Sequence, residues 1–178
     1  GRPNINQNPN FKGYNTSTRS DPIMYIVIHY TGAEGTAKNN IDYFNGGDRQ
    51  ASADFFVSQN GEIWQYNPNI EKRYSWHCGG GRQSSKGGAY FGMCKNANSI
   101  GIELCTHKQN GEWIFYDATI EAARRLVQYL MKTYNIKQKN VIRHYDVNGK
   151  NCPAVYGYAG DNAPKWDKFK ASLSASTT

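Results

Sequence analysis

The chain has 178 residues, of which 38% are hydrophobic, 13% are aromatic and 20% are charged. This composition excludes a disordered chain, and the length suits one domain with its own hydrophobic core. The formal net charge is +7, but lysine and arginine are scattered, with no run longer than Arg124-Arg125, which argues against a nucleic-acid-binding protein.

The first predicted elements are an arm, a strand and a helix. Residues 1–22 are polar and show little periodicity, which predicts an extended arm or linker. The run Met24–Ile28 is apolar and rich in β-branched residues, which predicts a central strand buried on both faces. A helical pattern then begins at Thr36, with Ile41 and Phe44 three residues apart on one side.

A predicted hairpin follows this helix. Ala53–Val57 is a second apolar strand, and Asn60-Gly61 is a strong turn signal ahead of the return strand Glu62–Tyr66. Residues 67–97 are rich in glycine, tyrosine and lysine and predict a long loop. A loop of that length inside a compact domain is usually functional or mobile.

The second half of the chain predicts two strands and two helices. Ser99–Leu104 is an apolar strand. Asp117 is a candidate helix cap, and beyond it apolar residues recur every three or four positions from Ile120 to Tyr134, which predicts the longest helix. Val141–His144 predicts a short final strand. A loop over 145–162 leads to a last helix over Pro164–Leu173.

This alternation of strands and helices predicts an α/β fold, with a central mixed β-sheet flanked by helices. The predicted domain covers residues 23–173, after the arm over 1–22, and residues 174–178 form a low-complexity tail or the start of a linker. No apolar stretch is long enough to span a membrane. We expect a monomer or one part of a modular protein.

The four cysteines show no C-x-x-C spacing, which argues against a zinc ribbon or zinc finger. Cys78 and Cys94 flank one glycine-rich loop and could pair in an oxidising compartment. The sequence leaves open whether they do.

Three candidate metal ligands lie at or after predicted strand ends. His29 ends the first strand, His144 ends the last, and Cys152 follows eight residues later. A catalytic zinc ion takes three protein ligands and one water, and imidazole and thiolate suit it. Each histidine could instead form only structural hydrogen bonds. A structural zinc would need a fourth ligand, for which the spare candidates are Cys105, His77 and His107.

Two further side chains suit chemistry beside such a metal. Glu103 lies inside an apolar strand, where burying a carboxylate without a partner is costly. If it faces the metal, it is a natural general base, and the alternative is a salt bridge on a sheet face. Lys150 lies two residues before Cys152 and could stabilise an oxyanion, or simply be solvated.

At this point the sequence resembles the type 2 N-acetylmuramoyl-L-alanine amidases, the family that includes peptidoglycan recognition proteins and many phage endolysins. The resemblance lies in five runs, in the family's order, over about residues 22–155. The runs are Tyr25–Gly32, Ala51–Val57, Asn98–Leu104, Val141–Val147 and Gly149–Pro153.

The resemblance implies a mixed-sheet fold with zinc in an open groove, and it implies a role for each matching residue. His29, His144 and Cys152 fall on the zinc-ligand positions. Glu103 falls on the position of the catalytic base, and Lys150 on that of the lysine that steadies the oxyanion.

The resemblance also implies residues that contact the substrate. Trp76 and His77 resemble a pair that lines the groove, and Asn98 matches an asparagine that holds the muropeptide. Tyr30, in the first run, is a further candidate. Tyr90, in the long loop, could stack on sugars or stem peptides, or pack within the loop itself.

One run departs from the family pattern. Asp54 stands where a histidine is usual, and Phe55 follows where a tyrosine is usual. Ala53 occupies the position at which some members place a catalytic tyrosine. The departure leaves Glu103 to carry the acid–base chemistry.

The implied function is zinc-dependent hydrolysis of the bond between the lactyl group and L-alanine in peptidoglycan, by an endolysin or autolysin. Such a protein acts on the cell wall and is secreted or phage-encoded. The net charge then suggests attraction to anionic wall polymers, although it also serves solubility. The alternative is a peptidoglycan-binding module without catalysis. Some recognition proteins in the family bind the wall but lack the ligand cysteine, so Cys152 favours the enzyme.

Overall fold

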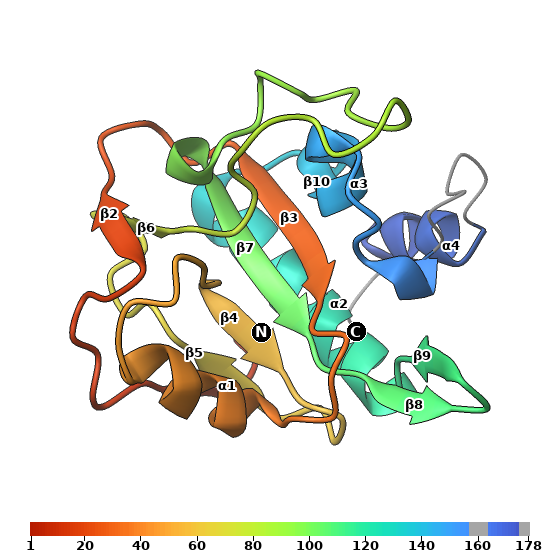
Figure 1. The fold of residues 1–178 in the computed structure, drawn as a ribbon, viewed down its shortest axis with the longest axis horizontal. Coiled ribbons are helices and arrows are strands. Elements are labelled where there is room, and N and C mark those ends of the chain that lie inside the picture. Colours follow the sequence, from red (N-terminus) through yellow and green to blue (C-terminus); the bar gives the residue numbers. More distant parts are fainter. Residues whose placement is uncertain (157–163, 175–178) are drawn as a thin grey trace.

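A six-stranded sheet forms the centre of the molecule (Figure 1). The structure is a computed structural model that describes residues 1–156 and 164–174. In spatial order the strands are β1 (Ile5–Gln7), β5 (Ile63–Gln65), β4 (Phe55–Val57), β7 (Ser99–Leu104), β3 (Tyr25–Tyr30) and β10 (Val141–Arg143). The four strands from β4 to β10 run parallel, whereas β5 lies antiparallel to β4. The predicted mixed sheet is confirmed.

Helices and two-stranded ribbons surround this sheet. The helices among the described residues are α1 (Ala37–Asn45), α2 (Asp117–Tyr134), α3 (His144–Asn148) and α4 (Pro164–Ser172). The ribbons are β2 (Thr16–Thr18) with β6 (Arg73–Ser75), and β8 (His107–Gln109) with β9 (Glu112–Ile114). None of the described helices is long and apolar enough to cross a membrane.

The larger hydrophobic core lies between the sheet and α2, which passes behind the sheet in Figure 1. Ile26 and Ile28 from β3 point to this side together with Ile102 from β7, because alternate residues of a strand share a face. The buried residues of α2 recur at helical spacing and are Thr119, Ala123, Leu126, Val127 and Leu130. The long amphipathic helix predicted from periodicity is therefore confirmed.

The opposite face of the sheet carries polar side chains near its centre. His29 and Glu103 lie one position after Ile28 and Ile102, so they point away from the main core. The parallel register pairs His29 with Glu103, and Glu103 with Phe56. Three neighbouring strands therefore present these side chains at one level on the same face.

Residues 1–22, predicted as an arm or linker, contain β1 and β2. β1 adds to the sheet beside β5, and β2 pairs with β6. Trp76, which follows β6, donates from Nε1 to Oγ of Ser17 at 2.8 Å. The segment thus packs against the fold, because main-chain pairing with strand edges holds it there.

Arg19 anchors this segment from inside the protein. Its guanidinium is buried and donates to three main-chain carbonyl oxygens, those of Ile70 at 2.7 Å, Ala97 at 2.8 Å and Ser99 at 3.1 Å. Asp54 adds electrostatic attraction. The N-terminal segment is therefore tied to the start of β7.

Two predicted boundaries differ in the structure. Asp117 is the first residue of α2, and Tyr116 takes the N-cap position without a side-chain hydrogen bond. His144 opens α3 instead of ending the last strand, because β10 stops at Arg143.

The two predicted loops contain regular structure. The loop over 67–97 contains β6, and the loop over 145–162 begins inside α3. The last part of the second loop lies outside the described residues, and so does the predicted tail over 174–178 apart from Ser174.

Replacing Arg19 with alanine should lower the free energy of unfolding by about 3 kcal/mol, because three main-chain carbonyls, two of them in buried hydrogen bonds, lose a charged donor. Urea unfolding of Arg19→Ala measures this loss. Lys72→Ala, which removes an exposed cation directly before β6, is the matched control. A loss for Arg19→Ala no larger than that of the control would contradict the anchoring role.

Candidate active site

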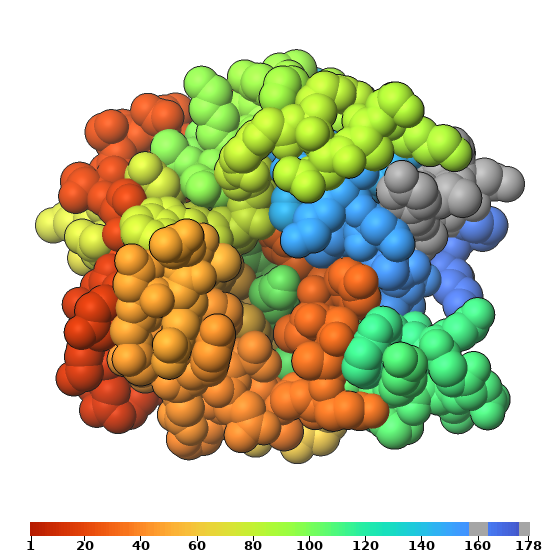
Figure 2. Space-filling view, in the orientation of Figure 1, coloured from red at the N-terminus to blue at the C-terminus, as the bar shows by residue number. Residues whose placement is uncertain are grey.

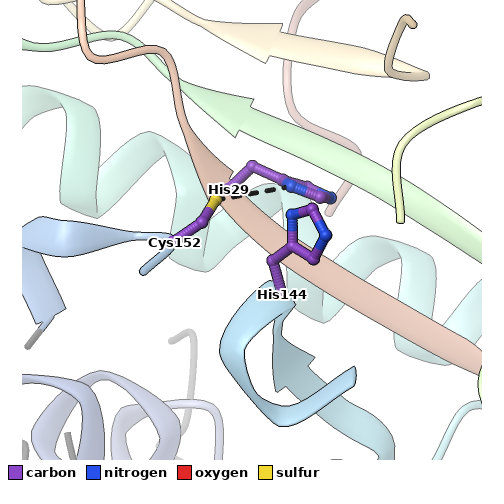
Figure 3. A group of neighbouring side chains, drawn as sticks. All are labelled: His29, His144 and Cys152. Carbon is purple, nitrogen blue, oxygen red and sulfur yellow. Dashed lines mark hydrogen bonds between the residues drawn. The ribbon is translucent and has the colours of Figure 1, made fainter. Parts of the chain in front are cut away.

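Three possible metal ligands meet on the polar face of the sheet (Figure 3). His29 lies in β3, His144 opens α3 after the neighbouring strand β10, and Cys152 lies in the loop after α3. One ligand atom from each lies within 4.8 Å of the other two. Sγ of Cys152 is 3.6 Å from Nδ1 of His29. The sequence prediction that these three side chains come together is confirmed.

The turn after β10 brings His144 and Cys152 to the same place. Asp146 caps α3 by accepting from the main-chain N–H of Arg143 at 2.8 Å, and it also pairs with the Arg143 guanidinium. Gly149 ends the helix with φ of 82°, a left-handed conformation that glycine adopts without strain. The main chain then returns, and the N–H of Tyr145 donates to the carbonyl of Cys152 at 2.9 Å.

Burial sets the protonation of these side chains. It lowers the pKa of His29 well below its usual value, and it lowers the pKa of His144 to about 3, with Lys150 adding repulsion. Both rings are therefore neutral near pH 7 and offer a lone pair. Burial also raises the pKa of the Cys152 thiol, with a further contribution from Glu103. Without a cation the thiol keeps its proton, and a bound metal would displace it.

The two ring nitrogens of His144 differ in their hydrogen bonding. Its Nε2 lies 3.1 Å from the side-chain amide of Asn148, whereas its buried Nδ1 has no hydrogen-bond partner among the described residues. A buried polar atom without a partner is destabilising unless a ligand satisfies it. The three side chains could therefore hold a metal ion.

No fourth protein ligand joins this group among the described residues. Cys105 lies in a separate buried cluster beside α1, and His107 pairs with Glu34. His77 is close, but its Nδ1 is 2.9 Å from Nε2 of His29 and so faces the side of that ring away from Cys152. A metal ion held by this group would have three protein ligands, which would leave a position open for water or substrate.

Glu103 lies beside the three ligands with an unpaired carboxylate. No group in the described part of the chain donates a hydrogen bond to it, and it reaches solvent only partly, through the pocket. Burial raises its pKa to about 8, opposed by attraction to Lys150 and His77. A carboxylate with a raised pKa that faces a pocket can accept and return a proton.

These residues line a pocket of about 380 Å³ that opens on one face of the molecule. A wider hollow of about 800 Å³ adjoins it and shares Ala51, Trp76, His77, His144 and Lys150. In Figure 2 the face is hollowed between the orange segment around α1 and the blue segment around α3. A larger hollow of about 1050 Å³ runs along the outer side of α2 and contains none of the candidate site residues.

Four residues predicted beyond the ligands and Glu103 line this pocket. They are Tyr30, Trp76, His77 and Lys150. Lys150 is exposed, and it belongs to both hollows. His77 has little freedom to contact a substrate, because its ring nitrogens lie 2.9 Å from His29 and 2.9 Å from Ser99.

The other two predicted substrate residues lie elsewhere. The side chain of Asn98 bonds within its own loop, accepting from the N–H of Lys95 and donating to the carbonyl of Met93. Tyr90 packs against Tyr25 and donates from its hydroxyl to the carbonyl of Lys139. Neither lines the pocket or the adjoining hollow. The polar atoms of both side chains therefore bond to main-chain groups, and for Tyr90 this agrees with the alternative that it packs within the protein.

Sequence reasoning missed several residues that line these hollows. The residues are Asn40, Phe44 and Phe56 in the pocket and Asn96 in the wider hollow. The sequence predicts Phe44 and Phe56 as core residues, because Phe44 continues the apolar side of a helix and Phe56 lies in an apolar strand. Asn96 accepts from the N–H groups of His77 and Cys78 and so shapes the wall. Only its position in the glycine-rich loop could have suggested a role.

Asp54, at the position where the family usually has histidine, serves the sheet and does not enter the pocket. It is fully buried, and its Oδ2 accepts from the N–H of Gly101 at 2.8 Å. Its Oδ1 accepts from the side chain of Asn67 at 2.9 Å. The departure from the pattern therefore fastens β4 to β7. Cys78 and Cys94 lie together in a small buried cluster as free thiols.

Known proteins resemble this chain in sequence. The profile of the N-acetylmuramoyl-L-alanine amidase family matches residues 19–155. The amidase CwlL of Bacillus licheniformis is 34% identical over 140 residues, which is 74% of this chain and 36% of that protein. The chain spans less than half the length of this relative.

Solved structures resemble it over nearly its whole length. The catalytic domain of XlyA superposes with a TM-score of 0.70 at 28% identity, covering 96% of this chain and 99% of that one. The catalytic domain of PlyG gives a TM-score of 0.71 at 27% identity, covering 98% of each chain. The chain belongs to the N-acetylmuramoyl-L-alanine amidase family.

Proposed function

We propose that this chain is a zinc-dependent catalytic domain that hydrolyses the amide bond between the lactyl group of N-acetylmuramic acid and L-alanine in peptidoglycan. The observation that carries the proposal is the meeting of His29, His144 and Cys152 beside the unpaired carboxylate of Glu103. Family membership supports the same reaction.

Zinc fits the three ligands better than other common ions. Zinc bonds of about 2.0 Å to nitrogen and 2.3 Å to sulfur, at a tetrahedral angle, separate the two ligand atoms by about 3.5 Å. The observed separation between His29 and Cys152 is 3.6 Å. Two imidazoles and a thiolate are too soft a set for magnesium or calcium. When bound, zinc would act as a Lewis acid that polarises the substrate carbonyl and acidifies water.

The protein's own groups handle the proton and the charge. Glu103 accepts a proton from the attacking water and delivers it to the nitrogen of L-alanine as the amide bond breaks. Lys150, exposed at the mouth of the same pocket, stabilises the negative charge that develops on the carbonyl oxygen. The reaction therefore needs the Glu103 carboxylate first in its deprotonated form and then in its protonated form.

The pocket and the adjoining hollow together suit the rest of the substrate. Trp76 and Tyr30 offer flat aromatic faces beside the reaction centre, and Phe44 adds apolar surface. Sugars and short peptides bind such mixed surfaces, with the polar loop around Asn96 along the wider part. We place the glycan strand and the peptide stem along these two hollows.

The setting of this reaction is the bacterial cell wall. We infer an endolysin or autolysin that is secreted or phage-encoded and that acts as a monomer or as part of a modular protein. The net charge of +7 favours approach to anionic wall polymers. A peptidoglycan-binding module without catalysis is the second candidate, but the buried thiol of Cys152 beside two imidazoles favours the enzyme.

Removing the metal should abolish cleavage. The chain should bind one zinc ion, because three ligands converge on one point, and a chelator should reduce amide hydrolysis to background until zinc is restored. Release of new L-alanine amino groups from purified cell walls measures the activity. Cys152→Ser should lose zinc, whereas Cys105→Ser, which alters a buried thiol outside the ligand group, should keep it. Full activity in metal-free protein would refute the zinc proposal.

Replacing Glu103 with glutamine should lower kcat by roughly 10²–10⁴-fold, because the amide keeps the shape but cannot take a proton. Zinc content should stay at the wild-type level, since Glu103 is not a ligand. Elemental analysis and the amino-group assay on the same sample separate the two effects. If Glu103→Gln turned over at the wild-type rate, another group would be the base.

Glu103 should also make the metal-free protein less stable as pH rises. Its pKa is about 8 when folded and about 4.5 in a free chain, so the folded state keeps a proton that the unfolded state loses between these values. The loss of stability should stay below about 1.4 kcal/mol per pH unit, because the pocket admits some solvent. The Tm of the wild type, relative to Glu103→Gln, should fall over this range. Parallel Tm curves for the two proteins would contradict this.

A further inference from the structure

A chain of hydrogen bonds runs from the main chain to the ligand His29. Oγ of Ser99 donates to the carbonyl oxygen of Lys95 at 2.6 Å. The same Oγ lies 2.9 Å from Nε2 of His77, whose Nδ1 lies 2.9 Å from Nε2 of His29. Each of these three side chains is at least nine-tenths buried. Water therefore competes little for these hydrogen bonds.

The direction of each bond follows from the first one. A serine hydroxyl has one proton, and Ser99 gives it to a carbonyl oxygen that can only accept. Nε2 of His77 must then donate to Ser99. In a neutral ring this leaves Nδ1 of His77 as an acceptor, so Nε2 of His29 carries a proton. The lone pair of His29 is consequently on Nδ1, the atom that faces Cys152.

The face of β7 provides the space for this arrangement. Ser99, Gly101 and Glu103 alternate along the strand and point to the same side. A Cβ atom at Gly101 would lie 2.5 Å from Cγ of His77, so only glycine leaves room for the ring. The main-chain N–H of His77 also donates to Asn96 at 3.0 Å. On this face of β7, Ser99 bonds to the His77 ring, Gly101 leaves space for that ring, and Glu103 is the proposed base.

We propose that His77 and Ser99 are positioning residues that lock His29 in the tautomer required for metal binding. The inference rests on the proposed zinc site and adds to it two residues that would act on the metal only through His29. His77 has no ring nitrogen left for a muropeptide, which reassigns it from the substrate groove to the support of a ligand.

The tautomer can be measured without any metal. In ¹⁵N NMR of metal-free protein, His29 should carry its proton on Nε2. Ser99→Ala should produce a mixture of both tautomers, because His77 loses the acceptor that orients its own proton. Ser75→Ala is the matched control, since it removes another fully buried hydroxyl, one without a hydrogen-bond partner in the described structure. A proton on Nδ1 of His29 in the wild type would overturn the proposal.

Zinc affinity gives an independent readout, measured by competition with a chromogenic chelator. Loss of such a supporting hydrogen bond typically weakens metal binding 10–100-fold. We expect that loss for His77→Ala and a smaller one for Ser99→Ala. His77→Asn should restore most of the affinity, because its side-chain oxygen can accept from His29 in place of Nδ1. Ser75→Ala should bind zinc like the wild type.

The outcomes separate the two proposals. If the wild type bound no zinc, the proposed function would fail, while the NMR tautomer would still test the hydrogen-bond chain. If the wild type bound zinc and both His77→Ala and Ser99→Ala bound it equally well, the positioning role would be refuted and the zinc site would stand.

Discussion

The parallel pairing of β3 with β7 is the constraint on which the site depends. This register sets His29 opposite Glu103 and Val27 opposite Gly101. Side chains alternate along a strand, so a slip of one residue would turn every side chain of one strand to the other face. Apolar residues on the alternate positions of both strands exclude such a slip, since they fill the core against α2. The hydrophobic face of the sheet thereby fixes the chemistry on its polar face.

The polar face of the sheet holds groups that are costly to bury. Some of these groups have several hydrogen-bond partners, and others have none among the described residues. Asp54 and Arg19, which perform no chemistry, have several hydrogen bonds each. Glu103 and Nδ1 of His144 have none among the described residues. The groups proposed to bind the metal or to transfer a proton have no hydrogen-bond partner in the described structure, whereas the residues that hold the scaffold have several. The N-terminal segment belongs to this scaffold through Arg19 and Ser17.

Much of the fold and of the candidate site could be predicted from the sequence. The apolar runs predict β3, β4 and β7, because buried parallel strands need β-branched and apolar residues on both faces. The spacing of apolar residues predicts α2. Two histidines and a cysteine at strand ends predict a metal site, and the resemblance to the family assigns its chemistry to Glu103 and Lys150. These signals are local in the sequence, or they lie in the five runs that follow the order of the amidase family.

Tertiary structure decided the rest. Asn98 matches a substrate position in sequence, and Tyr90 is an aromatic residue in the long loop, yet the polar atoms of both bond to main-chain groups of the folded chain. The N-terminal strands pair with segments more than 50 residues away, which no short-range pattern encodes. The resemblance of Trp76 and His77 to a groove-lining pair predicts a groove position for His77, and its ring does lie at the pocket wall. Its bonds to His29 and Ser99 exist only because the strands bring distant residues within 3 Å, so sequence alone determined the chemical groups and folding determined their partners.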